Sequence, residues 1–343
     1  MPPTVRLAVL GFGSVGRALA QLLLDRQPAL ARDTGLDWKV TGLASRRRGW
    51  LADPRGLDLS ACLASDLPPA PAPGHLEGWL HDSAADALVE LTSLDPHTGQ
   101  PAIDHIRAAL QRGLHAVTAN KGPVVYAHAE LEALAARHQA AFLFESTVMD
   151  GAPVFSLWRE ALPGLRLERL RGILNSTTNF LITRVEQGLA MDEALEEARA
   201  RGITETDPSA DLDGWDAAVK LAALATVLMG VPTQPGAVQR RGIRELTAPQ
   251  IRAARAEGRA LKLICRAARA PDGGLTASVA PESIPGDDPL AAVRGTSSAV
   301  CFETDLLPGL TLIEHDPGPE TTAYGVLADL LTLARRGLLP RRA

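Results

Sequence analysis

The pattern of apolar and polar positions changes once along the chain, and its first part alternates between two periods. Short apolar runs lie at 5–10, 39–44, 87–91, 116–119 and 141–144, and stretches with helical spacing lie at 15–24, 104–111 and 128–138. Short apolar runs between helical stretches are typical of parallel strands joined by crossover helices. This alternation predicts an α/β fold with a Rossmann-type doubly wound parallel sheet.

After Pro153 the alternation stops. Strand-like patterns at 167–174, 261–267 and 275–279 mix with strong helical patterns, and the stretch 216–229 is almost entirely apolar beyond Lys220. A helix that is apolar all round is buried on every side. We therefore expect two domains: a Rossmann domain over residues 1–148, completed by the last helix within 318–343, and an α+β domain over residues 149–317.

Composition limits the partners and the compartment. The net charge is −5 with no long basic run, so neither nucleic acid nor an anionic membrane is expected as the main partner. The cysteines Cys62, Cys265 and Cys301 are odd in number and widely spaced, which argues against a disulfide framework or a zinc cluster. The N-terminus lacks a signal-peptide pattern and no apolar run reaches membrane-spanning length, so the expected compartment is the cytoplasm.

The sequence GFGSVG at 11–16 follows the first apolar run and opens the first helical stretch. In that context the glycines predict a dinucleotide site, because they allow a tight turn, close approach to a pyrophosphate, and packing of the helix on the sheet. The helix N-terminus then faces the phosphate charge. The expected cofactor contacts are Gly11, Phe12, Gly13, Ser14, Val15 and Gly16. A glycine-rich turn without a ligand is the alternative.

The second apolar run ends in Ser45, Arg46, Arg47 and Arg48, with no carboxylate. NAD enzymes usually place an acid there for the ribose 2′-hydroxyl, whereas an arginine suits a 2′-phosphate. The sequence therefore favours NADP(H) over NAD(H), with Arg46 as the expected contact. A solvated arginine turn in an arginine-rich chain is the alternative.

Only four of the 35 basic residues are lysines: Lys39, Lys121, Lys220 and Lys262. Lysine can give up a proton, which arginine cannot. Asp216 and Lys220 lie four positions apart, hence on one helix face. An ordinary surface ion pair is the alternative, but the apolar helix around them favours a partly buried pair, in which a lysine pKa can be tuned for proton donation.

Two further segments carry polar residues between apolar runs. TANKGPV at 118–124 holds Lys121 at the end of a predicted strand, and GILNSTTNF at 172–180 holds an Asn-Ser-Thr-Thr-Asn cluster. The ordinary interpretations are a charge at a strand end and a helix N-cap.

Together with GFGSVG and ARARGITETDPSADLDGWDAAVKLA at 198–222, these segments resemble homoserine dehydrogenase over nearly the whole chain. The resemblance implies reversible, NADP(H)-dependent reduction of L-aspartate 4-semialdehyde to L-homoserine, in the biosynthesis of threonine, methionine and isoleucine. It also implies a homodimer or larger homo-oligomer, formed around a second domain that carries both substrate binding and dimerisation.

The resemblance assigns roles residue by residue. Lys220 is implied as the proton donor, and Lys121 lies next to both cofactor and substrate. The implied substrate contacts are Glu205, Asp216 and Thr177. The implied cofactor contacts, besides the glycine turn and Lys121, are Thr92, Ser93, Gly202 and Gly318.

The resemblance also raises two expectations in which this chain departs from many relatives. Where those members have a glycine-rich run and bind sodium or a similar cation, this chain has ESTVMDGAP; by spacing, the cation would meet Glu145, Val148, Asp150 and Ala152. Many members continue into a threonine-sensing C-terminal domain, whereas this chain stops soon after its final helix. A short form without threonine inhibition through such a domain is therefore expected.

Two other functions fit parts of the sequence. An acylating semialdehyde dehydrogenase needs a nucleophilic cysteine with a nearby base, but the three cysteines are interpreted as packing residues. A dinucleotide-binding sensor without turnover needs the glycine motif but not Lys220, Glu205 or Asp216.

Overall fold

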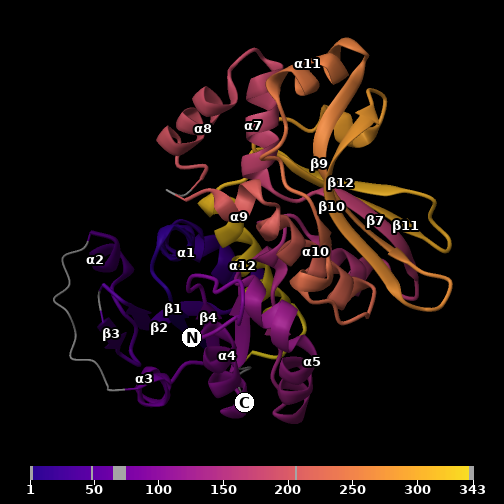
Figure 1. The fold of residues 1–343 in the computed structure, drawn as a ribbon. Coiled ribbons are helices and arrows are strands. Elements are labelled where there is room, and N and C mark those ends of the chain that lie inside the picture. Colours follow the sequence, from indigo (N-terminus) through magenta and orange to yellow (C-terminus); the bar gives the residue numbers. More distant parts are fainter. Residues whose placement is uncertain (1–2, 48, 65–74, 205–206, 340–343) are drawn as a thin grey trace. The chain divides into compact units, whose positions relative to one another are not determined.

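The structure is a computed structural model that describes residues 3–47, 49–64, 75–204 and 207–339. The chain divides into two compact units. The first unit comprises Met1–Gly151 together with Gly318–Ala343, and the second comprises Ala152–Pro317. Figure 1 shows the elements of both, and each unit is described by itself below.

The first unit contains a six-stranded sheet in the order β3-β2-β1-β4-β5-β6. All neighbouring strands pair in parallel except the edge strand β3, which is antiparallel to β2. The strands are β1 (Thr4–Leu10), β2 (Asp37–Ser45), β3 (Gly49–Ala52), β4 (Ala87–Glu90), β5 (His115–Thr118) and β6 (Phe142–Leu143). Strand order reverses between β1 and β4, as in a doubly wound sheet, where ligands bind outside the carboxyl ends of the strands.

The first unit also contains the helices between these strands and the last helix of the chain. They are α1 (Ser14–Thr34), α2 (Leu59–Ala64), α3 (Leu76–Ser83), α4 (Ala102–Gln111), α5 (Lys121–Arg137) and α12 (Pro319–Arg335), with a 3₁₀ turn η1 (Glu145–Thr147) after β6. Helix α12 packs against α1, and its Val326 and Leu330 are buried in the same core as Val9 and Leu19. The end of the chain thus completes the core of the first unit.

The second unit is built on a mixed sheet in the order β12-β11-β7-β9-β10-β8. All of its neighbouring strands are antiparallel except β8, which pairs in parallel with β10. The strands are β7 (Leu167–Ile173), β8 (Gln239–Arg240), β9 (Arg259–Arg269), β10 (Leu275–Pro285), β11 (Ser298–Thr304) and β12 (Leu310–Glu314). The long antiparallel pair β9–β10 is prominent in Figure 1.

The longer helices of the second unit carry its polar motifs. Its helical elements are α6 (Val154–Ser156), the π-turn η2 (Leu157–Ala161), α7 (Ser176–Glu186), α8 (Met191–Ala200), α9 (Ser209–Leu212), α10 (Trp215–Leu228), the 3₁₀ turns η3 (Pro235–Ala237) and η4 (Pro289–Ala292), and α11 (Ala248–Ala256). Eight residues of α10 between Ala217 and Ala225 are buried, all round the helix, as its apolar sequence predicts. No helix in the described part of the chain is long and apolar enough to cross a membrane.

Candidate active site

The glycine-rich turn of the first unit leaves the N-terminus of α1 open. Gly11 has φ +106°, and a Cβ there would collide with the Leu91 carbonyl. At Gly13, the residue before α1, a Cβ would meet nothing within 4 Å. The first turn of α1 holds no acidic residue, and Gly13 has no side chain to cap it. The N–H groups at this helix end can therefore bind a phosphate.

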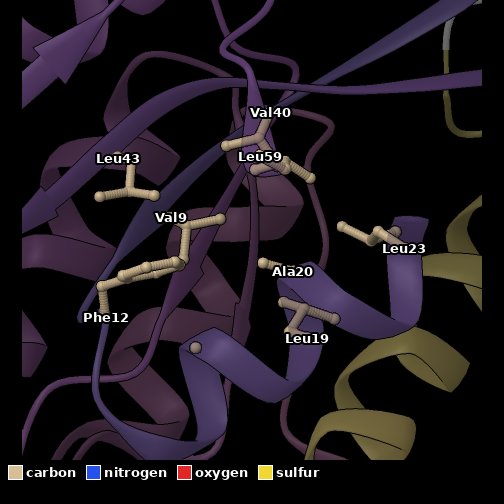
Figure 2. Close-up of a pocket in the computed structure, with 9 residues that line it drawn as sticks. Val9, Phe12, Leu19, Ala20, Leu23, Val40, Leu43 and Leu59 are labelled. Atoms are coloured by element: carbon tan, nitrogen blue, oxygen red, sulfur yellow. The ribbon is translucent and has the colours of Figure 1, made fainter. Parts of the chain in front are cut away.

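The other residues of this turn divide between surface and core. Ser14 is exposed, whereas Gly16 is buried because its Cα faces the Gly11 carbonyl. Phe12 points inward and, with Val9 and Leu19, lines a small apolar hollow between α1 and the sheet (Figure 2). This hollow does not admit a water molecule. Val15 packs on the same core, so Phe12 and Val15 present backbone rather than side chains to a ligand at the turn.

The loop after β4 lies beside the glycine turn at the carboxyl edge of the sheet. The Leu91 N–H donates to the Leu10 carbonyl at 2.7 Å, which joins this loop to the end of β1. Thr92 is half-buried, and its N–H donates to Glu90 Oε1 at 3.1 Å. Ser93 follows and is exposed. Thr92 and Ser93 thus lie at the switch point between β1 and β4, where a doubly wound sheet binds its ligand.

Lys121 is the first residue of α5, directly after the end of β5. Asn120 caps this helix by accepting a hydrogen bond from the Gly122 N–H at 2.9 Å, and its amide donates to the Thr92 carbonyl at 3.1 Å. A lysine at a helix N-terminus opposes the positive end of the helix dipole. Lys121 lies at the carboxyl edge of the parallel sheet, next to the loop that holds Thr92.

Arg46 and Arg47 of the arginine cluster lie in the turn that follows β2. The register pairs Ser45 with Gly49, and Arg46 and Arg47 are exposed in the turn; Arg48 lies outside the described residues. The Gly11 N–H donates to the Ala44 carbonyl at 2.8 Å, so this strand end adjoins the glycine turn. The adjoining position is where a Rossmann fold holds the adenosine ribose.

In the second unit, Asn175 gathers two carboxylates beside Lys220. Asn175 caps α7, and its amide nitrogen donates to Asp211 Oδ1 at 2.7 Å and to Asp216 Oδ2 at 3.1 Å. Lys220 Nζ lies 3.8 Å from Asp216 Oδ2. The Lys220 and Asp216 side chains are only 14% and 21% exposed, so this is a partly buried pair rather than a solvated one.

Thr177 lies beside this group, and Gly202 begins the segment that Thr177 contacts. The Thr177 hydroxyl donates to the Ile203 carbonyl at 3.3 Å, which ties the first turn of α7 to the segment after α8. Gly202 has φ +69° and begins that segment, and the Thr204 hydroxyl donates to Asp211 Oδ2 at 3.4 Å. Glu205, the third implied substrate contact, lies outside the described residues.

Asp211 belongs to this group although the sequence did not single it out. Burial, and then the neighbouring Asp216 carboxylate, raise the pKa of Asp211 above its ordinary value. A raised pKa beside a lysine and a second carboxylate is typical of a functional site. The available signal was its place within the acidic segment TETDPSADLDGWD, but nothing in the spacing distinguished it from its acidic neighbours.

The remaining predicted residues lie near the two positions in the sequence, 151–152 and 317–318, where the chain passes from one unit to the other. Gly318 is the N-cap of α12, with extended backbone, and its N–H donates to Thr321 Oγ1 at 2.9 Å. Asp150 has φ +39°, and its carboxylate accepts from the Thr322 hydroxyl at 2.6 Å. Glu145 and Val148 are buried, and the Ala152 carbonyl accepts from the Val154 N–H at 2.8 Å.

The side chains and carbonyls at these positions do not form a preorganised binding site for the cation expected from the resemblance. The Asp150 side chain and the Ala152 carbonyl are already engaged within their own units. Over the described residues, no group of three or more His, Cys, Asp or Glu side chains is placed to hold a metal. A cation at these residues would therefore need backbone carbonyls, which can accept more than one contact, in addition to any side chain.

The parallel sheet with an open glycine turn at its switch point, and the lysine–carboxylate group of the second unit, define an NAD(P)-dependent oxidoreductase. Comparison with known protein families identifies the family within this class of enzymes. Residues 11–145 match the NAD-binding domain of homoserine dehydrogenase, and residues 153–331 match the homoserine dehydrogenase domain. The chain belongs to the homoserine dehydrogenase family, an NAD(P)-dependent enzyme of amino-acid biosynthesis.

Curated relatives and solved structures agree. The chain is 38% identical to an NAD(+)-dependent homoserine dehydrogenase of Pseudomonas canavaninivorans, over 95% of each chain, and 34% identical to the homoserine dehydrogenase of Methanocaldococcus jannaschii, over 95% of this chain and 97% of the relative. A crystal structure from Thiobacillus denitrificans superposes with a TM-score of 0.84 at 31% identity, over 98% of this chain and 74% of the other. The structure of a mutant homoserine dehydrogenase from a hyperthermophilic archaeon, in complex with NADPH, superposes with a TM-score of 0.81 at 29% identity. The match covers 99% of this chain and 100% of the other.

These findings confirm the fold class and the family predicted from the sequence. They also weigh against the two other functions. The cysteines Cys62, Cys265 and Cys301 are all buried, and burial raises the pKa of the Cys265 thiol to about 12. A thiol held in its protonated form is a poor nucleophile, and burial keeps Cys62 and Cys301 from contact with a substrate, so none of the three suits an acylating mechanism.

Proposed function

We propose that this protein interconverts L-homoserine and L-aspartate 4-semialdehyde with NADP(H) as the preferred cofactor and Lys220 as the proton donor. The observation that carries the proposal is the group formed by Lys220, Asp216, Asp211 and Asn175. In this group, two carboxylates and a lysine ammonium lie within one partly buried site, which suits a substrate that carries both an ammonium and a reacting oxygen.

The proposed chemistry follows from the charges in this group. When bound, the reduced nicotinamide supplies a hydride to the aldehyde carbon. The aldehyde oxygen then gains negative charge, which the Lys220 ammonium stabilises and neutralises by giving up a proton. Asp211 and Asp216, with Glu205, bind the substrate ammonium, while the Asn175 amide holds the two aspartates in place. Thr177 contacts the substrate from the first turn of α7.

On the cofactor side, we assign the glycine turn to the pyrophosphate, and Thr92, Ser93 and Lys121 to the nicotinamide end. Gly202 and Gly318 stay predicted cofactor contacts. The monovalent cation at Glu145, Val148, Asp150 and Ala152 also stays a prediction, which a dependence of turnover on sodium or potassium would support. We further propose a cytoplasmic location, which fits three buried cysteines that form no disulfide, and a homodimer or larger homo-oligomer, as the resemblance implies.

The preference for NADP(H) rests on Arg46 and Arg47 in the turn beside the glycine motif, and on the lack of a carboxylate at the end of β2. The descriptions of the similar proteins name both cofactors. The Pseudomonas relative is described as NAD(+)-dependent, and the mutant archaeal homoserine dehydrogenase is in complex with NADPH. We expect Arg46→Ala to raise KM for NADP by about ten- to a hundredfold and to leave KM for NAD unchanged, because one charged contact to a phosphate is worth about 1.5–3 kcal/mol.

The first experiment is oxidation of L-homoserine by the purified protein, followed at the nicotinamide absorbance, with NADP and NAD in parallel. Turnover that favours NADP is the expected result. Turnover that favours NAD would remove the role given to Arg46 and keep the reaction. Cofactor binding without turnover would contradict the proposed reaction and favour a non-catalytic sensor. Arg26→Ala, a change of an exposed arginine of α1, is the matched control for Arg46→Ala.

A further inference from the structure

Glu90 is a fully buried carboxylate at the sheet edge where the predicted cofactor residues lie. It is the last residue of β4, and the strand register places it beside Leu10 of β1 and Thr118 of β5. Removing a carboxylate from water is costly unless hydrogen bonds replace its hydration. A carboxylate retained at this position therefore calls for an explanation beyond packing.

The carboxylate of Glu90 accepts hydrogen bonds from the ends of two neighbouring strands. Its Oε1 accepts from the Thr92 N–H at 3.1 Å and from the Thr92 hydroxyl. The Thr118 hydroxyl proton is shared between Oε2 at 3.1 Å and the Glu90 backbone carbonyl at 2.9 Å, and His105 of α4 places Nδ1 3.5 Å from Oε1. Because an ionised carboxylate offers only acceptors, it can satisfy these donors together.

These bonds extend to the start of α5. The Thr118 hydroxyl oxygen accepts from the Asn120 N–H at 2.9 Å, and the Asn120 amide donates back to the Thr92 carbonyl at 3.1 Å. Glu90, Thr92, Thr118 and Asn120 thus form a closed ring of hydrogen bonds. This ring joins the loop after β4 to the helix end that begins with Lys121.

We propose that Glu90 is a positioning residue for hydride transfer, because its carboxylate fixes Thr92 directly and the Lys121 end of α5 through Thr118 and Asn120. The inference rests on the proposed function, since it takes Thr92 and Lys121 as the residues at the nicotinamide. Glu90 itself contacts neither cofactor nor substrate. A displacement of reacting groups by about 1 Å can slow a reaction by about 10²-fold, so a loosened ring should act on the rate of hydride transfer.

The test combines three variants with an isotope effect. Glu90→Leu removes every acceptor, Glu90→Gln keeps the shape and one acceptor oxygen, and Thr118→Val removes the link to Asn120. We expect kcat to fall by about 10²-fold for Glu90→Leu and about tenfold for the other two. With L-homoserine deuterated at its alcohol carbon, the isotope effect on kcat should rise in each variant, because hydride transfer becomes the slower step.

A buried carboxylate elsewhere separates positioning from stability. Glu186 of α7 is 7% exposed and pairs with Arg294 at 3.1 Å. Glu186→Gln should lower Tm but keep the kcat and isotope effect of the wild type. If Glu90→Leu does not fold, Glu90→Gln and Thr118→Val decide. If both variants keep the wild-type kcat and isotope effect and only their Tm is lowered, the role of Glu90 is overturned and the proposed function stands. If the wild-type protein does not oxidise L-homoserine, the proposed function is overturned as well.

Discussion

Lys220 is one of four lysines among 35 basic residues, and its side chain is 14% exposed beside Asp216. Helical spacing alone was enough to place these two residues on one face, because residues four apart on a helix are neighbours. Asp211 could not be found in this way. Its place in the group depends on the Asn175 amide, a contact between residues 36 positions apart that no local pattern encodes.

Replacing Lys220 tests whether its proton or only its charge matters. We expect Lys220→Ala to lower kcat by about 10²–10⁴-fold, the range for losing general acid–base help. Lys220→Arg should be similarly impaired, because a guanidinium keeps the charge but gives up no proton. The measurement is steady-state homoserine oxidation, with cofactor affinity followed by nicotinamide fluorescence.

Lys39→Ala, a change of a lysine that is 42% exposed in β2, is the control and should keep wild-type turnover and affinity. Near-normal turnover of Lys220→Ala would contradict the role of proton donor. Full activity of Lys220→Arg would show that charge alone is sufficient.

At the scale of elements, the sequence predicts the strands of the first sheet better than those of the second. The five apolar runs of the first unit correspond to β1, β2, β4, β5 and β6. The edge strands β3 and β12 were not predicted, because they are only partly buried and lack a clear alternation of apolar and polar positions. In the second sheet, the two-residue edge strand β8 and the largely buried interior strand β11 were missed as well.

The start of α5 shows a second limit of local patterns. Helical spacing predicted a helix over 128–138, but the helix begins at Lys121 and includes Gly122 and Pro123. Proline and glycine discourage a helical interpretation, yet proline is tolerated in the first turn, where its missing N–H has no intrahelical partner to lose. Lys121, predicted as a site residue at a strand end, is therefore the first residue of a helix.

The glycine turn gives a prediction about backbone conformation. Alanine at Gly11 should lower cofactor affinity and destabilise the protein by more than about 1–2 kcal/mol, because it adds a collision with the Leu91 carbonyl to the cost of a positive φ. Chemical denaturation and cofactor titration measure the two effects.

Gly188→Ala is the matched control for this change. Gly188 has φ +113°, similar to the +106° of Gly11, but a Cβ there meets nothing within 4 Å. The difference in free energy of unfolding between the two variants isolates the collision. Equal destabilisation of both would contradict the close approach of Leu91 to Gly11.

At the scale of the whole molecule, His115 attaches the end of the chain to the first sheet. Its Nε2 lies 2.9 Å from the Leu338 carbonyl, and its Nδ1 accepts from the Ala141 N–H at 3.1 Å. Burial lowers the pKa of His115 below its ordinary value. The two contacts require the neutral ring, since a protonated Nδ1 cannot accept a hydrogen bond.

This arrangement predicts a loss of stability in mild acid. Because the folded-state pKa lies below the unfolded value of about 6.5, the unfolded chain takes up a proton first as the pH falls, and stability decreases below that pH. His115→Gln should flatten the fall of Tm between pH 7 and pH 5. His315→Gln, a change of an exposed histidine, should leave the slope unchanged. Parallel slopes for wild type and His115→Gln would contradict the prediction.

The return of α12 to the first unit has a consequence for synthesis. A ribosome makes residues 1–151 first, yet the face of α1 that packs on α12 is covered only when Val326 and Leu330 arrive, after the whole second unit. The nucleotide-binding unit, which is the first to emerge, is thus the last to be completed. During translation its exposed α1 face depends on temporary protection, for example by a chaperone, and a nascent chain stalled before residue 318 would leave this face uncovered.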